Sequence, residues 1–242
     1  MLLTVVIPVY NEAGTLADVV DRVQAVDFDK EILIVDDAST DGSAEVATEI
    51  ERRHANVSLL RHARNRGKGR ALRTGFARAT GDFVIVQDAD LEYDPADFPR
   101  LLSPLMKGKA DAVFGSRFIS SSEHRVLYFR HYLGNSLLTF LSNLATDLNL
   151  TDMESGYKAF RRQLLQSLVL EENRFGFEPE ITSKIAKAGA RVYEVGISYH
   201  GRTYEQGKKI RARDGLWALW CIFKYALKPL RRRRIPSGPS KT

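Results

Sequence analysis

In the first half of the chain, short β-branched apolar runs alternate with longer stretches in which apolar residues recur every three or four positions. The short runs are typical of buried strands, and the longer stretches are typical of amphipathic helices. The pattern predicts strands at residues 3–7, 31–35, 57–61, 83–87 and 111–114, and helices at 15–25, 43–53, 68–79 and 95–107. This alternation predicts an α/β fold, with an open, mostly parallel, Rossmann-like sheet and helices on both faces.

The second half is less regular. Residues 128–148 have the pattern of one long amphipathic helix, whose apolar stripe we expect to face the core. The stripe consists of Leu133, Leu137, Phe140, Leu141, Leu144 and Leu148. A strand at 191–197 is predicted to join the sheet, and the basic, glycine-containing segment 199–215 is predicted to be a mobile loop.

The segment 216–227 is apolar on nearly every side. A helix packed on a core would bury one stripe, formed by Leu216, Leu219, Trp220, Phe223 and Leu227, and would leave Trp217, Ile222 and Tyr225 outside it. Four arginines follow at 231–234, and an apolar helix beside a basic run is typical of a segment that lies on an anionic membrane surface. Burial against another subunit is the alternative. We therefore predict a domain at 1–212, an amphipathic membrane-surface helix at 213–230 and a disordered basic tail at 231–242.

Composition narrows the class of protein. With 242 residues, 44% of them hydrophobic and 27% charged, the chain can form one well-packed domain. The single cysteine, Cys221, excludes an internal disulfide and a multi-cysteine metal site, which fits the cytoplasm. No run of about 18 apolar residues predicts a membrane-spanning helix, so we expect peripheral or monotopic contact with the cytoplasmic face of a membrane.

The net charge of +6 suits nucleic acid, an anionic membrane or a phosphorylated substrate. A nucleic-acid-binding module without catalysis would explain the basic tail but not the acidic motifs described next. We therefore expect no nucleic acid among the partners.

The most informative motif is Asp88-Ala89-Asp90, which directly follows the predicted strand at 83–87 and precedes Glu92. Two carboxylates at alternate positions beyond a buried strand can hold a divalent cation together with a diphosphate, whose oxygens complete the ligand shell of Mg²⁺ or Mn²⁺. A D-x-D sequence alone is common in turns and helix caps, but its place at a strand end of an α/β sheet favours a metal site.

A second acidic cluster begins with Asp36 and Asp37, after the predicted strand at 31–35. Ligands of open α/β sheets bind beyond the carboxyl ends of the strands, so we expect both clusters to face one cleft. A carboxylate there can accept hydrogen bonds from a ribose or from the edge of a base.

Together with VIPVYNE at 6–12 and NRGKG at 65–69, these motifs resemble the family 2 glycosyltransferases, and within them the dolichol-phosphate mannose synthase group of polyprenyl-phosphate glycosyltransferases. The resemblance extends from residue 3 to about residue 228 and implies a GT-A fold. It also implies that Asp88, Asp90 and Glu92 bind Mg²⁺ or Mn²⁺, although the third position is often glutamine in this group. The residues implied to hold the nucleotide-sugar are Pro8, Tyr10, Glu12, Asp37, Gly67, Lys68 and Asp88.

The resemblance also points to Arg117, to the segment 151–158 that contains Glu154, and to Arg202 with Lys208. An arginine fork matches phosphate oxygens and lysine adds a point charge, so Arg117, Arg202 and Lys208 are candidates for binding the acceptor phosphate. The alternative for these basic residues is a solvated charged surface.

A lipid phosphate needs no general base, because its second pKa is about 6 and it is largely dianionic at neutral pH. We therefore predict direct, inverting transfer of a hexose from a UDP- or GDP-hexose to a polyprenyl phosphate. The candidate catalytic residues are Asp90, Arg117, Arg202 and Glu154. The alternative is a family 2 enzyme that glycosylates a saccharide hydroxyl, for which Glu154 or Asp152 would be the base.

Overall fold

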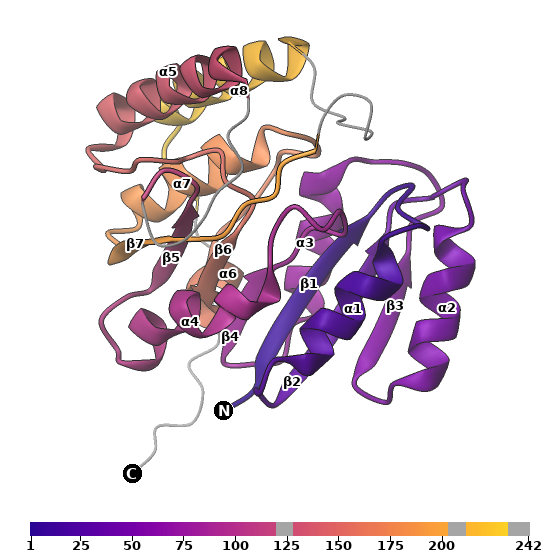
Figure 1. Ribbon diagram of the computed structural model, residues 1–242. Helices are drawn as coiled ribbons and strands as arrows, with labels where there is room; N and C mark the ends of the chain where they lie inside the picture. Colours follow the sequence, from indigo (N-terminus) through magenta and orange to yellow (C-terminus); the bar gives the residue numbers. More distant parts are fainter. Residues whose placement is uncertain (120–127, 203–211, 232–242) are drawn as a thin grey trace.

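A seven-stranded sheet forms the centre of the computed structural model, which describes residues 1–119, 128–202 and 212–231 (Figure 1). The strands lie in the order β3-β2-β1-β4-β6-β5-β7. Their bounds are β1 Leu3–Val9, β2 Lys30–Asp36, β3 Val57–Arg61, β4 Phe83–Val86, β5 Ala112–Ser116, β6 Lys158–Arg161 and β7 Val192–Gly196. All neighbouring pairs are parallel except those made by β6, which runs antiparallel to both β4 and β5. The predicted mostly parallel α/β sheet is therefore confirmed.

Helices cover both faces of the sheet. The helices are α1 Leu16–Ala25, α2 Ser43–Arg53, α3 Lys68–Arg78, the short 3-10 helix η1 Pro95–Asp97, α4 Phe98–Met106, α5 Phe129–Thr146, α6 Arg162–Ser167, α7 Phe177–Lys187 and α8 Ala212–Leu227. One buried cluster joins the sheet to α1, α2 and α4, and a second joins the opposite face to α3, α6 and α7. In β1, Leu3, Val5, Ile7 and Val9 belong to the first cluster and Val6 to the second, because side chains alternate across a strand.

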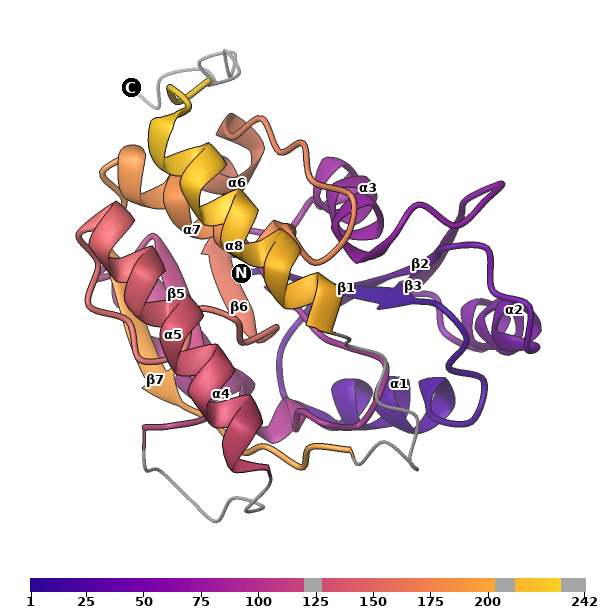
Figure 2. The ribbon, with the colours of Figure 1, turned by 90° about the horizontal axis from the view of Figure 1, so that it is seen from above.

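The helices α5 and α8 lie side by side on the outside of α7, farther from the sheet than the other helices (Figures 1 and 2). Both contact α7, and they contact each other. Among the residues that the structure describes, none of the helices is long and apolar enough to cross a membrane.

The six predicted strands are present at nearly their predicted bounds, and the helices of the first half are as predicted except that the segment 95–107 is divided into η1 and α4. The sequence pattern missed β6, α6 and α7. The strand β6 has only four residues, KAFR, two of them basic, and α7 buries charged residues as well as apolar ones. Neither element has a separate polar face, so the alternation of apolar and polar residues that identifies strands and helices in a sequence is absent.

The prediction that the apolar stripe of 128–148 faces the core is wrong. The described stripe residues are mostly solvent-exposed: Leu133 by 50%, Leu137 by 57%, Phe140 by 64% and Leu144 by 76%. The buried residues of α5 are instead Thr139 and Ser142, which lie on its polar side. Only Leu141 and Leu148 of the stripe pack, partly buried, against the core.

The stripe predicted for α8 is also wrong. Of its members, Leu216, Trp220, Phe223 and Leu227 are 52% to 87% exposed, whereas Ile222 and Tyr225, predicted to lie outside the stripe, are almost fully buried. The predicted loop 199–215 is wrong at its end as well, because α8 begins at Ala212. Residues 203–211 of that loop, and 232–242 of the predicted tail, lie outside the described part of the chain. The proposed division into three parts stays a prediction.

Candidate functional site

The loops after β1 and β2 hold each other beyond the carboxyl ends of these strands. The backbone N–H of Asn11 donates to Ser39 Oγ (3.0 Å), and the N–H of Thr40 donates to Asn11 Oδ1 (2.8 Å). Asn11 has a left-handed backbone (φ 54°), which its short polar side chain tolerates better than most residues do. Tyr10, in the middle of this loop, exposes 40% of its surface. It directly follows β1, at the edge of the sheet where the sequence predicted the nucleotide.

Asp37 is used to hold a second loop. Its carboxylate, 2% exposed as a residue, accepts hydrogen bonds from the backbone N–H groups of Arg66 (2.9 Å) and Gly67 (2.6 Å). It also contacts Nδ1 of His62 at 2.6 Å. The sequence suggested that Asp37 accepts a hydrogen bond from a ribose or base, whereas its partners in the structure are the protein's own groups. His62 has no motif signal and was missed.

Gly67 and Gly69 are required by close packing against the segment 172–174. A Cβ at Gly67, where φ is +93°, would lie 2.5 Å from the carbonyl oxygen of Asn173. One at Gly69 would lie 2.6 Å from the carbonyl oxygen of Glu172. Both distances are shorter than real Cβ contacts, so a larger side chain would push the two segments apart. The glycines thereby fix Lys68 between them.

Lys68 extends from the start of α3 to the D-x-D motif. Its Nζ lies 2.8 Å and 2.9 Å from the two oxygens of Asp88, and 3.6 Å from Oε1 of Glu178 on α7. Burial lowers the pKa of Lys68, but the carboxylates of Asp88 and Glu178 raise it by more, so the ammonium stays charged. Lys68 therefore neutralises part of the acidic cluster.

Asp90, Glu92 and Glu12 converge on Arg202. The guanidinium donates to Asp90 Oδ2 at 3.0 Å and to Glu12 Oε1 at 3.2 Å, and the backbone N–H of Arg202 donates to Glu92 Oε1 at 2.9 Å. Burial raises the pKa of Asp90 to about 7, and the charges of Asp88 and Glu92 act in the same direction, while Arg202 opposes them. A concentrated negative charge here needs cations, and Arg202 and Lys68 supply them.

Arg117 is held by a buried carboxylate. Its Nε and Nη2 donate to the two oxygens of Asp152 at 2.6 Å and 2.7 Å, and Asp152 is fully buried. Nη2 also donates to Asn135 Oδ1 of α5 at 3.1 Å. The guanidinium lies 5.2 Å from the ring of Tyr199, whose hydroxyl donates to Glu92. Tyr199 therefore connects the Arg117 pair to the acidic cluster.

Glu154 lies on the loop that follows Asp152. Its Oε1 is buried and has no hydrogen-bond partner among the described residues. Burial raises the pKa of Glu154 to about 8, with a contribution from the nearby charge of Glu178. Burial also lowers the pKa of Lys158 to about 8, against the charges of Glu178, Asp152 and Glu154. Most Glu154 side chains are therefore protonated at neutral pH.

The structure brings most of the predicted site residues together. Two groups of ion pairs meet at the D-x-D motif: Lys68 pairs with Asp88, and Arg202 pairs with Glu12, Asp90 and Glu92. Pro8 lies near the end of β1, whereas Tyr10, Asp37, Gly67, Arg117 and Glu154 lie on loops between strands and helices. Lys208 lies outside the described residues. Among the residues that the structure describes, no group of three histidine, cysteine or acidic side chains could by itself hold a metal ion.

Sequence reasoning missed Tyr93 and Glu178 in addition to His62. The hydroxyl of Tyr93 accepts a hydrogen bond from the backbone N–H of Gly156 (3.0 Å), and its ring stacks on Tyr157 with centroids 4.8 Å apart. Glu178 follows no strand and belongs to no recognised motif; the only signal was a charged residue inside the apolar pattern of FEPEI.

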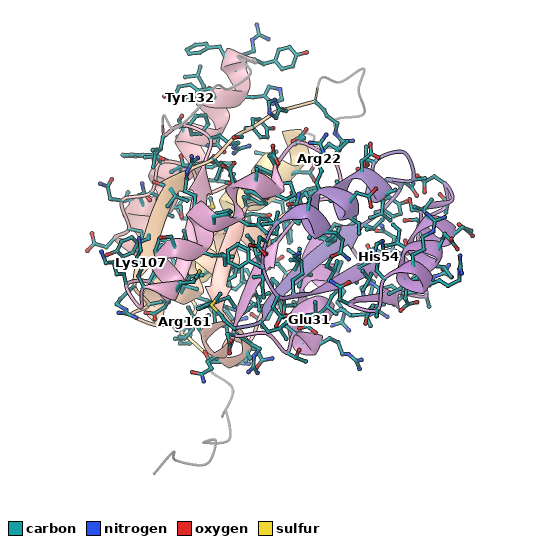
Figure 3. All side chains as sticks on the ribbon, turned by 60° about the horizontal axis from the view of Figure 1, so that its bottom comes forward. Arg22, Glu31, His54, Lys107, Tyr132 and Arg161 are labelled. Atoms are coloured by element: carbon teal, nitrogen blue, oxygen red, sulfur yellow. The ribbon has the colours of Figure 1, made fainter. Side chains whose placement is uncertain are left out.

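The apolar outer surface of α5 and α8 reaches this site. Tyr132 of α5 packs edge-to-face on Phe118, the neighbour of Arg117, with ring centroids 5.2 Å apart. Figure 3 labels Tyr132 near the end of α5 that stands out from the body of the molecule. On α8, Trp217 Nε1 donates to Glu172 Oε2 at 3.2 Å, next to the segment on which Gly69 packs. Both outer helices therefore contact segments that border the site.

Sequence comparisons identify similar proteins. The sequence model of the family described as glycosyl transferase family 2 matches residues 4–169. The chain is 28% identical over 214 residues to the undecaprenyl-phosphate mannosyltransferase of Micrococcus luteus, covering 86% of this chain and 87% of that protein. It is 29% identical to the dolichol-phosphate mannosyltransferase of Pyrococcus furiosus, covering 87% of this chain and 61% of that protein.

A third relative is the low-salt glycan biosynthesis hexosyltransferase Agl6 of Haloferax volcanii, at 30% identity over 84% of this chain. The match spans 49% of that protein, so the chain covers about half of its length. Among solved structures, glucosyl-3-phosphoglycerate synthase of Mycobacterium tuberculosis in complex with Mn²⁺, UDP and glucosyl-3-phosphoglycerate superimposes with a TM-score of 0.72. It covers 97% of this chain and 87% of that one at 21% identity, which is a similarity of fold.

Proposed function

Since the chain belongs to the family 2 glycosyltransferases, we propose that it transfers a hexose from a UDP- or GDP-hexose to a polyprenyl phosphate, with inversion at the anomeric carbon. The relatives named for transfer to undecaprenyl phosphate and dolichol phosphate support this acceptor. The observation that carries the proposal is the position of Arg117. Asn135 and Phe118 connect it directly to the exposed apolar surface of α5.

The acidic cluster suits a metal–diphosphate complex. Asp88 and Asp90 offer the hard oxygen ligands that Mg²⁺ and Mn²⁺ prefer, with Glu92 as a third candidate. Because the described side chains do not form a complete metal site by themselves, diphosphate oxygens would complete the ligand shell. When bound, such an ion stabilises the negative charge of the departing nucleoside diphosphate. The solved fold neighbours that contain Mn²⁺ or Mg²⁺ support divalent-metal use.

The protein's own residues then have three tasks. Tyr10 and the loop that Asp37 holds bind the nucleoside, and Lys68 supplies positive charge next to the diphosphate. Arg117 and Arg202 draw the acceptor phosphate toward the anomeric carbon, where the phosphate oxygen attacks in line with the leaving group. No general base is required, because the phosphate is already ionised.

A hydroxyl acceptor remains the alternative, and it would need a base. Asp152 suits that role poorly, because both of its oxygens accept hydrogen bonds from Arg117. Glu154 is the remaining candidate, with a pKa of about 8 that leaves a minority of side chains ionised at neutral pH. For the alternative we therefore favour Glu154 over Asp152 as the base.

We also propose that the exposed faces of α5 and α8 bind a membrane surface. The apolar side chains on α5 are Phe129, Tyr132, Leu133, Leu137, Phe140 and Leu144, and those on α8 are Leu216, Trp217, Trp220, Phe223 and Leu227. Monomeric soluble proteins rarely expose a contiguous apolar patch of this kind. Exposed Arg130 and Arg231 lie on or next to these helices, and the net charge of +6 favours an anionic leaflet.

The proposal is tested with radiolabelled UDP- and GDP-hexoses, Mg²⁺ or Mn²⁺, and vesicles with or without polyprenyl phosphate. The expected result is label in the organic phase only when polyprenyl phosphate and a divalent cation are both present. The anomeric configuration of the product should be opposite to that of the donor. Label in a water-soluble saccharide would instead establish the hydroxyl acceptor and make Glu154 the candidate base.

A further inference from the structure

Two carboxylates beside the D-x-D motif have oxygens without partners. Glu178 is 3% exposed, and its Oε2 is buried with no hydrogen-bond partner among the described residues. The same holds for Oε1 of Glu154. A buried polar atom without a partner destabilises a protein, and nearly all such atoms in folded proteins are hydrogen-bonded. Two of them in one place call for a functional explanation.

Both side chains lie next to the residues proposed to hold the diphosphate. Oε1 of Glu178 is 3.6 Å from Lys68 Nζ, which contacts Asp88 at 2.8 Å. Glu154 belongs to the loop that passes Asp88, because a Cβ at Gly156 would lie only 2.5 Å from Asp88 Oδ2. The sugar of a nucleotide-sugar is attached directly to the diphosphate. The unpartnered oxygens are therefore near the place where a donor sugar would lie.

Positioning of Lys68 does not account for them. Lys68 contacts Oε1 of Glu178 and leaves Oε2 unused, and Glu154 makes no ion pair with Lys68 among the described residues. Lys158 brings positive charge near both carboxyls, but its Nζ donates to the backbone carbonyls of Met153 and Ser155 and leaves the two free oxygens without a partner among the described residues. Sugar hydroxyls are suited to this position, because each can donate a hydrogen bond to a carboxyl oxygen.

We propose that Glu178 Oε2 and Glu154 Oε1 bind two hydroxyl groups of the donor hexose and thereby select a neutral hexose with both hydroxyls free. This inference rests on the proposed nucleotide-sugar donor. A uronic acid would bring a further negative charge next to the Glu178 carboxylate. A donor that lacks one of the hydroxyls would leave a buried carboxyl oxygen unpaired, which is the strongest form of hydrogen-bond discrimination.

The test compares the parent with Glu178→Gln and Glu154→Gln, and uses Glu45→Gln on the exposed face of α2 as a matched control. Calorimetric titration measures the affinity for UDP and GDP and for the corresponding intact hexose nucleotides. Each site variant should weaken binding of the hexose nucleotide by about 10- to 100-fold. Its affinity for the free nucleoside diphosphate should change by less than about twofold, because only the sugar contacts these oxygens.

Deoxy-sugar donors provide the sharper readout. The parent should discriminate against two singly deoxygenated donors. Glu178→Gln should lose discrimination at one of the two positions, and Glu154→Gln at the other. Equal loss of affinity for hexose nucleotide and free diphosphate would overturn the inference, and so would unchanged discrimination against every deoxy donor. The two single variants, checked by thermal melting, make the test independent of the stability of either one.

Failure of the inference is distinguishable from failure of the proposed function. A parent protein that binds no nucleotide-sugar would overturn both. A parent that binds and transfers a hexose, with variants that discriminate as the parent does, would overturn only the roles given to Glu178 and Glu154.

Discussion

The helices α1 and α5 have similar repeats of apolar residues, yet the fold uses them in opposite ways. In α1 the repeat formed by Leu16, Val19, Val20 and Val23 is buried against the sheet. In α5 the described part of the repeat is largely exposed, and the helix buries Thr139 and Ser142. Periodicity establishes that a helix has an apolar face, but what covers that face depends on the position of the helix in the fold.

The inward face of α5 is polar because it holds the loop that leads to the site. The hydroxyl of Thr139 accepts a hydrogen bond from the backbone N–H of Met153 (3.2 Å). The side chain of Asn143 bonds to both the N–H and the carbonyl of Leu150, and Asn135 bonds to Asp152. The polar side of α5 therefore positions the loop at 150–153, while its apolar side is available to a lipid.

The largest expected effect is on the free energy of unfolding. It compares an ion pair that holds the loop at 150–153 with an ion pair on α2, in the first half of the molecule. Arg117→Met leaves the fully buried Asp152 carboxylate without its main partner, so the free energy of unfolding should fall by about 3–5 kcal/mol. Arg52→Met removes an exposed ion pair on α2 and should leave the free energy of unfolding nearly unchanged, because water screens such pairs. Urea unfolding measures both, and equal losses would contradict the structural role of the Arg117–Asp152 pair.

The next prediction separates chemistry from stability at the end of β4. Asp90→Ala should lower transfer by about 10²- to 10³-fold, because it removes a proposed metal ligand. Stability should not fall, since Asp90 is crowded by the charges of Asp88 and Glu92. Steady-state rates and thermal melting measure the two effects. Asp18→Ala, the same change on the exposed side of α1, should leave both unchanged; an active Asp90→Ala protein would remove Asp90 from the mechanism.

Two adjacent residues of α8 sharpen the comparison of covered and uncovered faces. Ile222 is 4% exposed and Phe223 is 52% exposed. Ile222→Ser should destabilise the protein by about 3–4 kcal/mol, because it leaves a cavity and buries a hydroxyl. Phe223→Ser should change stability by less than about 0.5 kcal/mol but weaken binding to anionic vesicles by about tenfold. Sedimentation with vesicles and urea unfolding distinguish the two, and reversed effects would show that the faces are misassigned.

The last prediction is a pH dependence. The pKa of Glu154 is raised from 4.5 to about 8 in the folded protein, so folding favours its protonated form. Its contribution to stability is fully present below pH 4.5 and is lost as the pH rises through about 8. The parent should therefore lose stability relative to Glu154→Gln over this range. Urea unfolding at several pH values measures the difference. If the urea midpoints of the two proteins change by the same amount across this pH range, the buried environment of Glu154 is contradicted.

The sequence predicted the fold best where each strand or helix packs against a single neighbouring layer of the fold. The strands β1 to β4 and their helices follow the alternation of apolar runs, because a strand or helix against a sheet must bury a definite face. The acidic motifs at Asp37, Asp88 and Asp90 were found for the same reason: residues that directly follow buried strands meet at one edge. The resemblance to the family added Lys68, Arg117 and Arg202, which no periodicity identifies.

The rest depends on long-range contacts that local patterns do not contain. Glu178 belongs to the site only because the segment before α7 packs on Gly67 and Gly69, about a hundred residues earlier in the chain. The place of Asp37 after β2 could be predicted, whereas its contacts with His62 and with the backbone of Gly67 could not, because they join segments far apart in the chain. The exposure of α5 and α8 follows from their place outside α7, which the sequence pattern does not reveal.

The most direct test of the account asks whether the apolar helices and the donor site act together on a lipid. Transfer from a hexose nucleotide is measured to a long-chain polyprenyl phosphate in vesicles and to a short, water-soluble prenyl phosphate. The triple variant Leu137→Ser, Phe140→Ser and Leu144→Ser should lose transfer to the long-chain lipid by at least about tenfold. It should keep transfer to the short acceptor within about twofold. Equal activity of variant and parent toward the long-chain lipid would contradict the account.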